Sequence, residues 1–164
     1  MLLNFTKMHG IGNDFVIFDA INQSVNLSAE QLIKVADRHF GIGCDQILLV
    51  EPPTVPDADF RYRIFNADGG EVQQCGNGAR CFVRFVHEKK MTTKSTLRVE
   101  TLGGIIEIAM QDSGEITVDM GAPRFEPEAL PLLADTASDR YSASIEGQEI
   151  CFGAVSMGNP HAIL

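Results

Sequence analysis

The stretch Gln74-Cys75-Gly76-Asn77-Gly78-Ala79-Arg80-Cys81-Phe82 places a cysteine where an extended segment ends and a helix begins. The glycine-asparagine-glycine run after the cysteine is poor for a helix interior, but it suits a tight turn whose backbone N–H groups point outward. Residues 79–89 then predict a helix. A thiol at its N-terminus is close to a partial positive charge that favours the thiolate. We therefore predict that Cys75 is a nucleophile or base, rather than a small buried hydrophobe, the common role of cysteine.

The predicted helix carries apolar residues on more than one side, at Phe82, Val83, Phe85 and Val86. A helix of this kind is usually enclosed by a sheet. The chain around it offers strands with alternating or compact apolar patterns, at residues 14–19, 46–51, 60–64, 97–101, 105–110 and 116–120. Short turns join the last three into an antiparallel meander. We therefore expect an α/β chain of the α+β type, with a sheet wrapped around a central helix.

Composition and charge argue against several classes of protein. The 164 residues include 13 basic and 22 acidic side chains, a formal net charge of −9, so we expect no nucleic-acid partner. No apolar run reaches the ~20 residues needed to cross a bilayer, and the N-terminus lacks a signal-peptide pattern, so we expect no membrane partner. The four cysteines, Cys44, Cys75, Cys81 and Cys151, form no C-x-x-C pair, which predicts reduced thiols in the cytoplasm and no metal site.

A short internal sequence repeat predicts a duplication. Residues 12–18 (GNDFVIF) match residues 158–164 (GNPHAIL) at the glycine, the asparagine and the isoleucine, and apolar residues align at two further places. Chance is the alternative explanation for so short a match. We expect residues 1–121 to form an N-terminal domain that contains Cys75, and residues 122–164 to form a linker and the start of a second domain. On this interpretation the chain is part of a longer protein.

Amide side chains recur at predicted turns and strand edges, where they can face a pocket or stabilise turns. Several amides around one thiolate would suit the carboxylate and ammonium groups of an amino acid. The thiolate could remove the α-proton if N–H donors stabilise the charge that develops. Inversion also needs an acid on the opposite face, and a duplicated unit would place a second cysteine about 60 residues beyond the last of these amides. The amides are Asn13, Gln46, Asn66, Asn77 and Asn159.

Four motifs together resemble the diaminopimelate epimerase family: residues 8–15 (MHGIGNDF), 66–69 (NADG), 75–81 (CGNGARC) and 157–161 (MGNPH). The resemblance implies a cofactor-independent isomerase that interconverts LL- and meso-diaminopimelate in lysine and peptidoglycan precursor biosynthesis. It also implies two pseudo-symmetric domains, each with a curved mixed or antiparallel sheet around a central helix, and a homodimer of the full-length protein. The family's second cysteine motif and its Glu-Arg substrate contacts have no counterpart in residues 1–164. We therefore expect these residues alone to be inactive.

The same resemblance implies a role for each matching residue. Cys75 corresponds to one catalytic base or acid, and His161 corresponds to a residue that supports catalysis. Gly76 and Asn77 correspond to a cradle for the substrate carboxylate at the helix N-terminus. The substrate-binding amides are Asn13, Gln46, Asn66 and Asn159.

Two alternatives stay open at this point. A proline racemase-like enzyme would also use two cysteines as acid and base, although Asn77 within Cys-Gly-Asn-Gly fits diaminopimelate epimerase better. A non-catalytic amino-acid binding module would instead bury Cys75 as a packing residue. In every case the expected partner is a small-molecule substrate or ligand.

Overall fold

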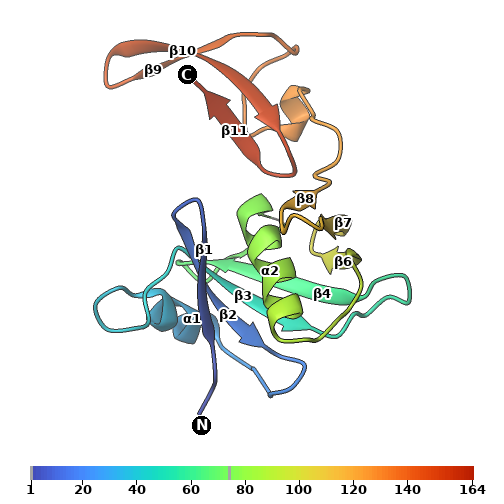
Figure 1. The fold of residues 1–164 in the computed structure, drawn as a ribbon. Coiled ribbons are helices and arrows are strands. Elements are labelled where there is room, and N and C mark those ends of the chain that lie inside the picture. Colours follow the sequence, from blue (N-terminus) through green and yellow to red (C-terminus); the bar gives the residue numbers. More distant parts are fainter. Residues whose placement is uncertain (1, 74) are drawn as a thin grey trace. The chain divides into compact units, whose positions relative to one another are not determined.

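The computed structural model describes residues 2–73 and 75–164. Gln74, which opens the stretch quoted above, lies outside the described residues. Backbone contacts divide the chain into two compact units, Met1–Asp119 and Met120–Leu164, which Figure 1 colours along the sequence. Within the described residues, no helix has both the length and the apolar character needed to cross a membrane.

The first unit contains an eight-stranded mixed sheet. The strand order is β1-β2-β3-β4-β6-β7-β8, and β5 pairs with β4 off this path. Two neighbouring pairs, β2 with β3 and β4 with β6, are parallel, and the other pairs are antiparallel. The strands are β1 (Thr6–Gly10), β2 (Asn13–Asp19), β3 (Gln46–Glu51), β4 (Phe60–Asn66), β5 (Glu71–Val72), β6 (Thr96–Thr101), β7 (Gly104–Met110) and β8 (Ile116–Val118).

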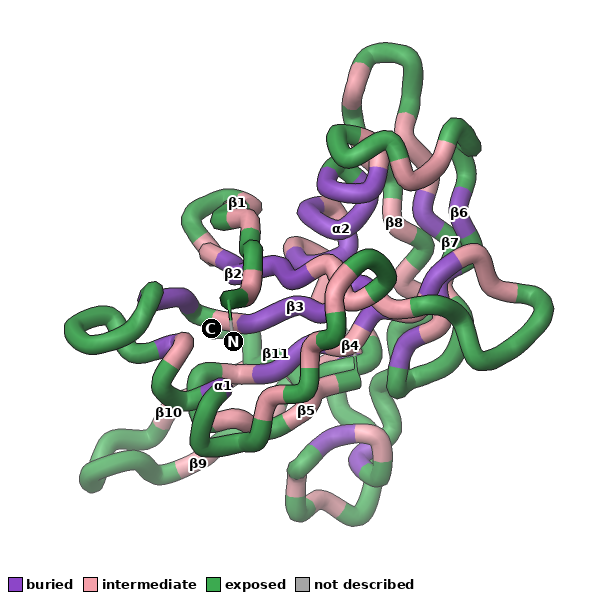
Figure 2. Tube along the Cα trace, turned by 90° about the horizontal axis from the view of Figure 1, so that it is seen from below, coloured by how far each residue is buried: buried purple, intermediate pink, exposed green. Residues whose placement is uncertain are grey.

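Helix α2 (Gly76–Glu88) lies at the centre of this sheet (Figure 1). It contacts β1 and β2 near one edge of the strand order and β7 and β8 at the other, so the sheet curves around it. Phe82 is fully buried against Phe60 and Tyr62, with ring centroids 5.8 and 5.6 Å apart. Figure 2 shows the buried residues following α2 and the neighbouring strands. The predicted sheet wrapped around a central helix is therefore confirmed.

The opposite face of the sheet is covered by α1 (Ala29–Ala36). Ser28 and Gln31 form a reciprocal capping box at the start of this helix. Successive strand residues point to opposite faces, so Ile17 of β2 packs in the cluster around α2, whereas Val16 packs in a second cluster with residues of α1. The sheet is thus buried on both faces along β2, which fixes its position between the two helices.

The second unit contains a 3₁₀ turn (Pro127–Ala129) and a three-stranded antiparallel sheet of β9 (Tyr141–Ile145), β10 (Gln148–Ser156) and β11 (Pro160–Ile163). The two similar sequence segments also share a structural feature, a hairpin turn at the same glycine. Gly12 and Gly158 both lie at hairpin turns with positive φ, 86° and 91°, between β1 and β2 and between β10 and β11. A left-handed conformation of this kind favours glycine. The shared turn supports the predicted duplication.

Candidate active site

Three of the predicted amides lie at one edge of the first unit's sheet. Asn13 is the first residue of β2, and Gln46 is the first residue of β3, which runs parallel to β2. Asn66 is the last residue of β4, which runs antiparallel to β3, and it is paired directly with Gln46. The starts of two strands and the end of a third therefore meet, which brings amides from distant parts of the sequence to the same place.

Cys75 is the N-cap residue of α2, and its side chain closes the first turn of that helix. Its Sγ accepts a hydrogen bond from the backbone N–H of Gly78 at 3.4 Å. Its own backbone N–H donates to the hydroxyl of Tyr62 on β4 at 3.0 Å. Burial raises the pKa of Tyr62 well above its usual range, so the phenol stays neutral. These bonds tie the half-buried thiol to the strand that ends at Asn66, and the N–H from Gly78 favours negative charge on sulfur.

The structure brings Cys75 and Asn13 together. The thiol lies 3.8 Å from Asn13 Oδ1, in a geometry in which S–H donates to the amide oxygen. The amide nitrogen of Asn13 donates to Asp45 Oδ2 at 3.2 Å. Asn13 is therefore held between the thiol and a carboxylate.

Tight packing leaves little room for a side chain at two glycines near the first turn of α2. A Cβ at Gly78 would lie 3.0 Å from Ile64 Cδ1, and a Cβ at Gly10 would lie 3.3 Å from Asn77 Cβ. The end of β1 therefore packs directly against the first turn of α2. Asn77, in this turn, accepts a hydrogen bond from Arg80 through Oδ1. Gly76 begins the helix beside it.

Gln46 and Asn66 form a second polar pair at the same sheet edge. Gln46 Nε2 donates to Asn66 Oδ1 at 2.8 Å in a half-buried setting. Gln46 Oε1 is buried and has no hydrogen-bond partner among the described residues. A buried acceptor without a donor is unfavourable.

Asn159 and His161 belong to the second unit, next to the turn that contains Gly158. A His161 ring nitrogen lies 3.0 Å from Asn159 Oδ1, and both residues are exposed. The structure thus brings these two predicted residues into contact with each other.

Sequence reasoning did not identify Tyr62, Asp45 or Arg38, which anchor the residues beside the thiol. Arg38 pairs with Asp14 and Asp45 at 2.8 Å. The guanidinium holds the pKa of Asp14 well below its usual range. The sequence did contain a sign of Asp45 and its partners. An aspartate stands next to an amide residue at the start of both β2 and β3. In the described part of the chain, no cluster of three or more His, Cys, Asp or Glu side chains could hold a metal ion.

We predict that Cys75 is alkylated faster than the other three cysteines. Burial raises the pKa of the Cys81 thiol to about 11 and also raises that of Cys44. Cys151 is exposed, but it lies on strand β10 and not at a helix N-terminus. Mass spectrometry of the folded protein after timed treatment with iodoacetamide measures the four rates, with unfolded protein as the control. Faster reaction at Cys44, Cys81 or Cys151 would contradict the prediction.

Comparison with known proteins adds independent findings. The family model described as "Diaminopimelate epimerase" matches residues 5–126. A diaminopimelate epimerase from Aromatoleum aromaticum is 61% identical, over 99% of this chain and 59% of that relative. One from Nitrosospira multiformis is 57% identical, over 99% of this chain and 58% of that relative. The chain therefore spans about three-fifths of the length of these relatives.

The fold also matches a solved structure. A hydroxyproline epimerase from Agrobacterium vitis superposes with a TM-score of 0.70 at 17% sequence identity, over 96% of this chain and 50% of that one. At this identity the likeness establishes the fold alone. It confirms the predicted fold class.

Proposed function

This chain belongs to the diaminopimelate epimerase family, and from that membership we propose that the full-length protein interconverts LL- and meso-diaminopimelate without a cofactor. The observation that carries the proposal is the setting of Cys75. Its sulfur lies at a helix N-terminus, receives an N–H bond from Gly78 and contacts Asn13. A half-buried thiol with such partners is suited to taking up and releasing a proton.

Recognition of an amino acid fits the groups around the sulfur. The N-terminus of α2, at Gly76 and Asn77, offers backbone N–H groups and a partial positive charge to a substrate carboxylate. Asn13 and Asn66 add amide groups. Gln46, which bonds Asn66, adds a third amide beside them. We assign these residues to substrate binding.

The proposed reaction is two proton transfers at one carbon. The thiolate of Cys75 takes the α-proton and becomes a thiol, while N–H donors at the helix start stabilise the charge that moves onto the carboxylate. A second thiol, on the opposite face, then donates a proton to the α-carbon and becomes a thiolate. The reverse direction exchanges the two roles. We assign the second thiol to a cysteine outside residues 1–164.

The second unit supplies two further residues to the proposal. Asn159 would bind substrate, and His161 would support catalysis by holding the Asn159 amide through their 3.0 Å contact. We propose that residues 1–121 form the first domain and that residues 122–164 lead into a second one. We also propose that the full-length enzyme is a cytoplasmic homodimer that serves lysine and peptidoglycan precursor biosynthesis.

Solvent-deuterium incorporation tests the proposed function. Full-length protein incubated with LL-diaminopimelate in D₂O should produce the meso isomer with deuterium at the inverted carbon. Proline and trans-4-hydroxyproline serve as competing substrates, because a proline racemase-like enzyme would act on them instead. Absence of inversion for diaminopimelate would refute the proposal. Tight binding without deuterium uptake would favour the non-catalytic binding module.

Asn66→Ala should weaken the binding of diaminopimelate by about 1–3 kcal/mol, because a buried charged group of the ligand would lose a hydrogen-bond partner. Calorimetry of the full-length variant measures this change. Asn22→Ala is the matched control, since Asn22 bonds Asp19 just beyond the other end of β2. Equal effects of the two variants on affinity would remove Asn66 from the proposed binding site.

A further inference from the structure

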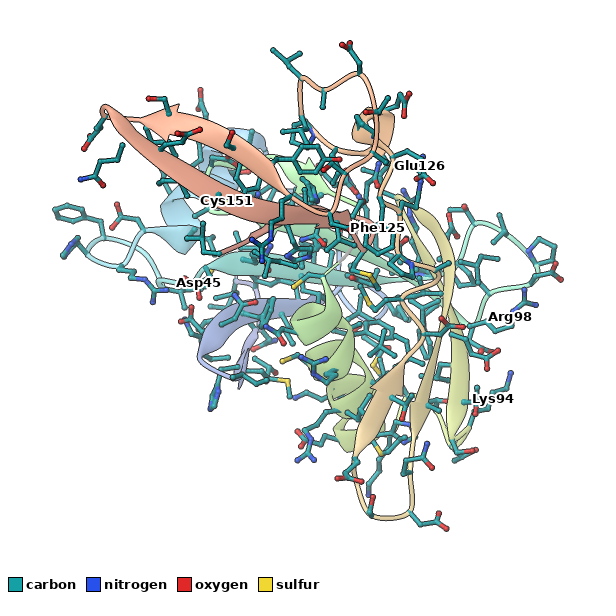
Figure 3. The ribbon with its side chains drawn as sticks, turned by 90° about the horizontal axis from the view of Figure 1, so that it is seen from above. Asp45, Lys94, Arg98, Phe125, Glu126 and Cys151 are labelled. Atoms are coloured by element: carbon teal, nitrogen blue, oxygen red, sulfur yellow. The ribbon has the colours of Figure 1, made fainter. Side chains whose placement is uncertain are left out.

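Asp45, labelled in Figure 3, immediately precedes β3. Its side chain contacts the start of the neighbouring strand β2. Its Oδ2 accepts from Asn13 Nδ2 at 3.2 Å and from the backbone N–H of Asp14 at 3.0 Å. Its Oδ1 accepts from Arg38 at 2.8 Å. Both oxygens of this carboxylate are therefore engaged, and its orientation is fixed.

A reciprocal network holds Asp45 from the other side. Its backbone N–H donates to Asp14 Oδ1 at 2.9 Å, and Arg38 donates to both oxygens of Asp14 at 2.8 and 3.1 Å. Lys7 adds an ion pair with Asp14 at 2.8 Å. These bonds link the starts of two parallel strands, and they hold the Asp45 carboxylate in place although 45% of its side chain is exposed.

The carboxylate decides which end of the Asn13 amide faces Cys75. The two ends of an amide have nearly the same shape, but one donates and the other accepts hydrogen bonds. An ionised carboxylate can only accept, so Asn13 must present Nδ2 to Asp45. Its oxygen is then the end that lies 3.8 Å from the sulfur. We propose that Asp45 is a positioning residue that acts through Asn13 to present an acceptor oxygen to Cys75.

This arrangement gives each protonation state of the sulfur its own partner. The N–H of Gly78 stabilises the thiolate, and the oxygen of Asn13 accepts the S–H of the thiol. A group that removes a proton in one direction and donates it in the other needs both states to be accessible. The inference rests on the proposed function only in giving Cys75 that proton-transfer role.

Other groups near the sulfur do not replace Asp45 in this role. Tyr62 from β4 and Cys81 from α2 interact electrostatically with Cys75, but burial raises the pKa of both. Both groups therefore stay neutral near pH 7. Arg80 on α2 bonds Asn77. Asp45 therefore acts on the sulfur through Asn13, which contacts both groups.

The test compares Asp45→Ala with Asp45→Asn in the full-length protein. In Asp45→Ala the Asn13 amide is free to turn its nitrogen toward the sulfur, so Cys75 should be alkylated by iodoacetamide at lower pH. The kcat should fall between about 10- and 100-fold, as for a small misplacement of a catalytic group. Asp45→Asn keeps an acceptor oxygen for Asn13 but removes the charge, and it should restore both properties. Asp19→Ala removes a carboxylate that accepts from an asparagine amide and backbone N–H groups at the other end of β2, and it should change neither.

Three results would overturn the inference. Equal alkylation shifts in Asp45→Ala and Asp45→Asn would assign the effect to charge alone. A lower melting temperature with an unchanged alkylation profile would assign Asp45 a structural role only. If Asp45→Ala does not fold, Asn13→Ala replaces it. That variant leaves Asp45 bonded to Arg38 and should shift alkylation from the wild-type profile, so an unchanged profile would also refute the inference.

The alkylation assay contains no substrate, so it separates this inference from the proposed function. A shifted profile in a protein that does not invert diaminopimelate would refute the function and leave the positioning role in place. An active wild-type enzyme whose Asp45 variants behave alike would refute the positioning role alone.

Discussion

Replacing Cys75 with alanine in the full-length protein should abolish inversion while leaving substrate binding largely intact. The sulfur is assigned proton transfer, whereas the N–H groups and amides around it are assigned recognition. Loss of a general base or acid lowers turnover by about 10²–10⁴-fold. Such a loss falls on the chemical step more than on affinity. A chiral assay for turnover and calorimetry for binding separate the two effects in the same variant.

Cys151→Ala is the matched control for this prediction, because Cys151 is an exposed cysteine on strand β10. It should keep wild-type turnover. Normal turnover of Cys75→Ala would show that the thiol at the helix N-terminus is structural. Loss of both binding and turnover, with the fold retained, would instead show that the sulfur is needed for recognition.

The central helix and most of the sheet could be predicted because their signals are local. A run of apolar residues around Phe82 on several sides of one helix indicates enclosure by a sheet, and α2 is buried in this way. The antiparallel meander of β6, β7 and β8 could be predicted equally well, because Gly103-Gly104 and Asp112–Gly114 mark its turns. Each of these patterns needs only neighbouring residues to be recognised.

Strands β1 and β9 are among the strands that were not predicted. Residues 6–10 form an edge strand with no fully buried side chain, so their sequence lacks a strong alternating apolar pattern. Residues 141–145 lie at the edge of the second sheet and are half-buried or exposed. Strand formation there depends on pairing with a partner that lies elsewhere in the sequence, and a local window does not contain that partner.

The site shows the same division between local and non-local information. The helix start at Cys75 could be predicted, because the residues that make it are adjacent. The bond between Gln46 and Asn66 depends on the register of two antiparallel strands, and the contact between Asn13 and Asp45 depends on parallel pairing. Register emerges only from the assembled sheet.

Residues 1–164, produced by themselves, should fail to interconvert LL- and meso-diaminopimelate. Inversion needs an acid on the face of the α-carbon opposite Cys75. Cys44 and Cys81 are buried, and burial raises the pKa of both thiols. Cys151 lacks the glycine-rich helix start that surrounds Cys75. The same chiral assay measures product formation, with the full-length protein as the positive control.

Folding of residues 1–164 must be checked in the same experiment, because an unfolded chain would be inactive for a trivial reason. Circular dichroism and preferential alkylation of Cys75 over Cys81 would establish that the sheet around α2 has formed. A folded but inactive product is the expected result, since one thiol can remove the α-proton but cannot deliver another from the opposite side. Turnover comparable to that of the full-length protein would contradict the two-thiol mechanism, because a single cysteine at the start of α2 would then suffice.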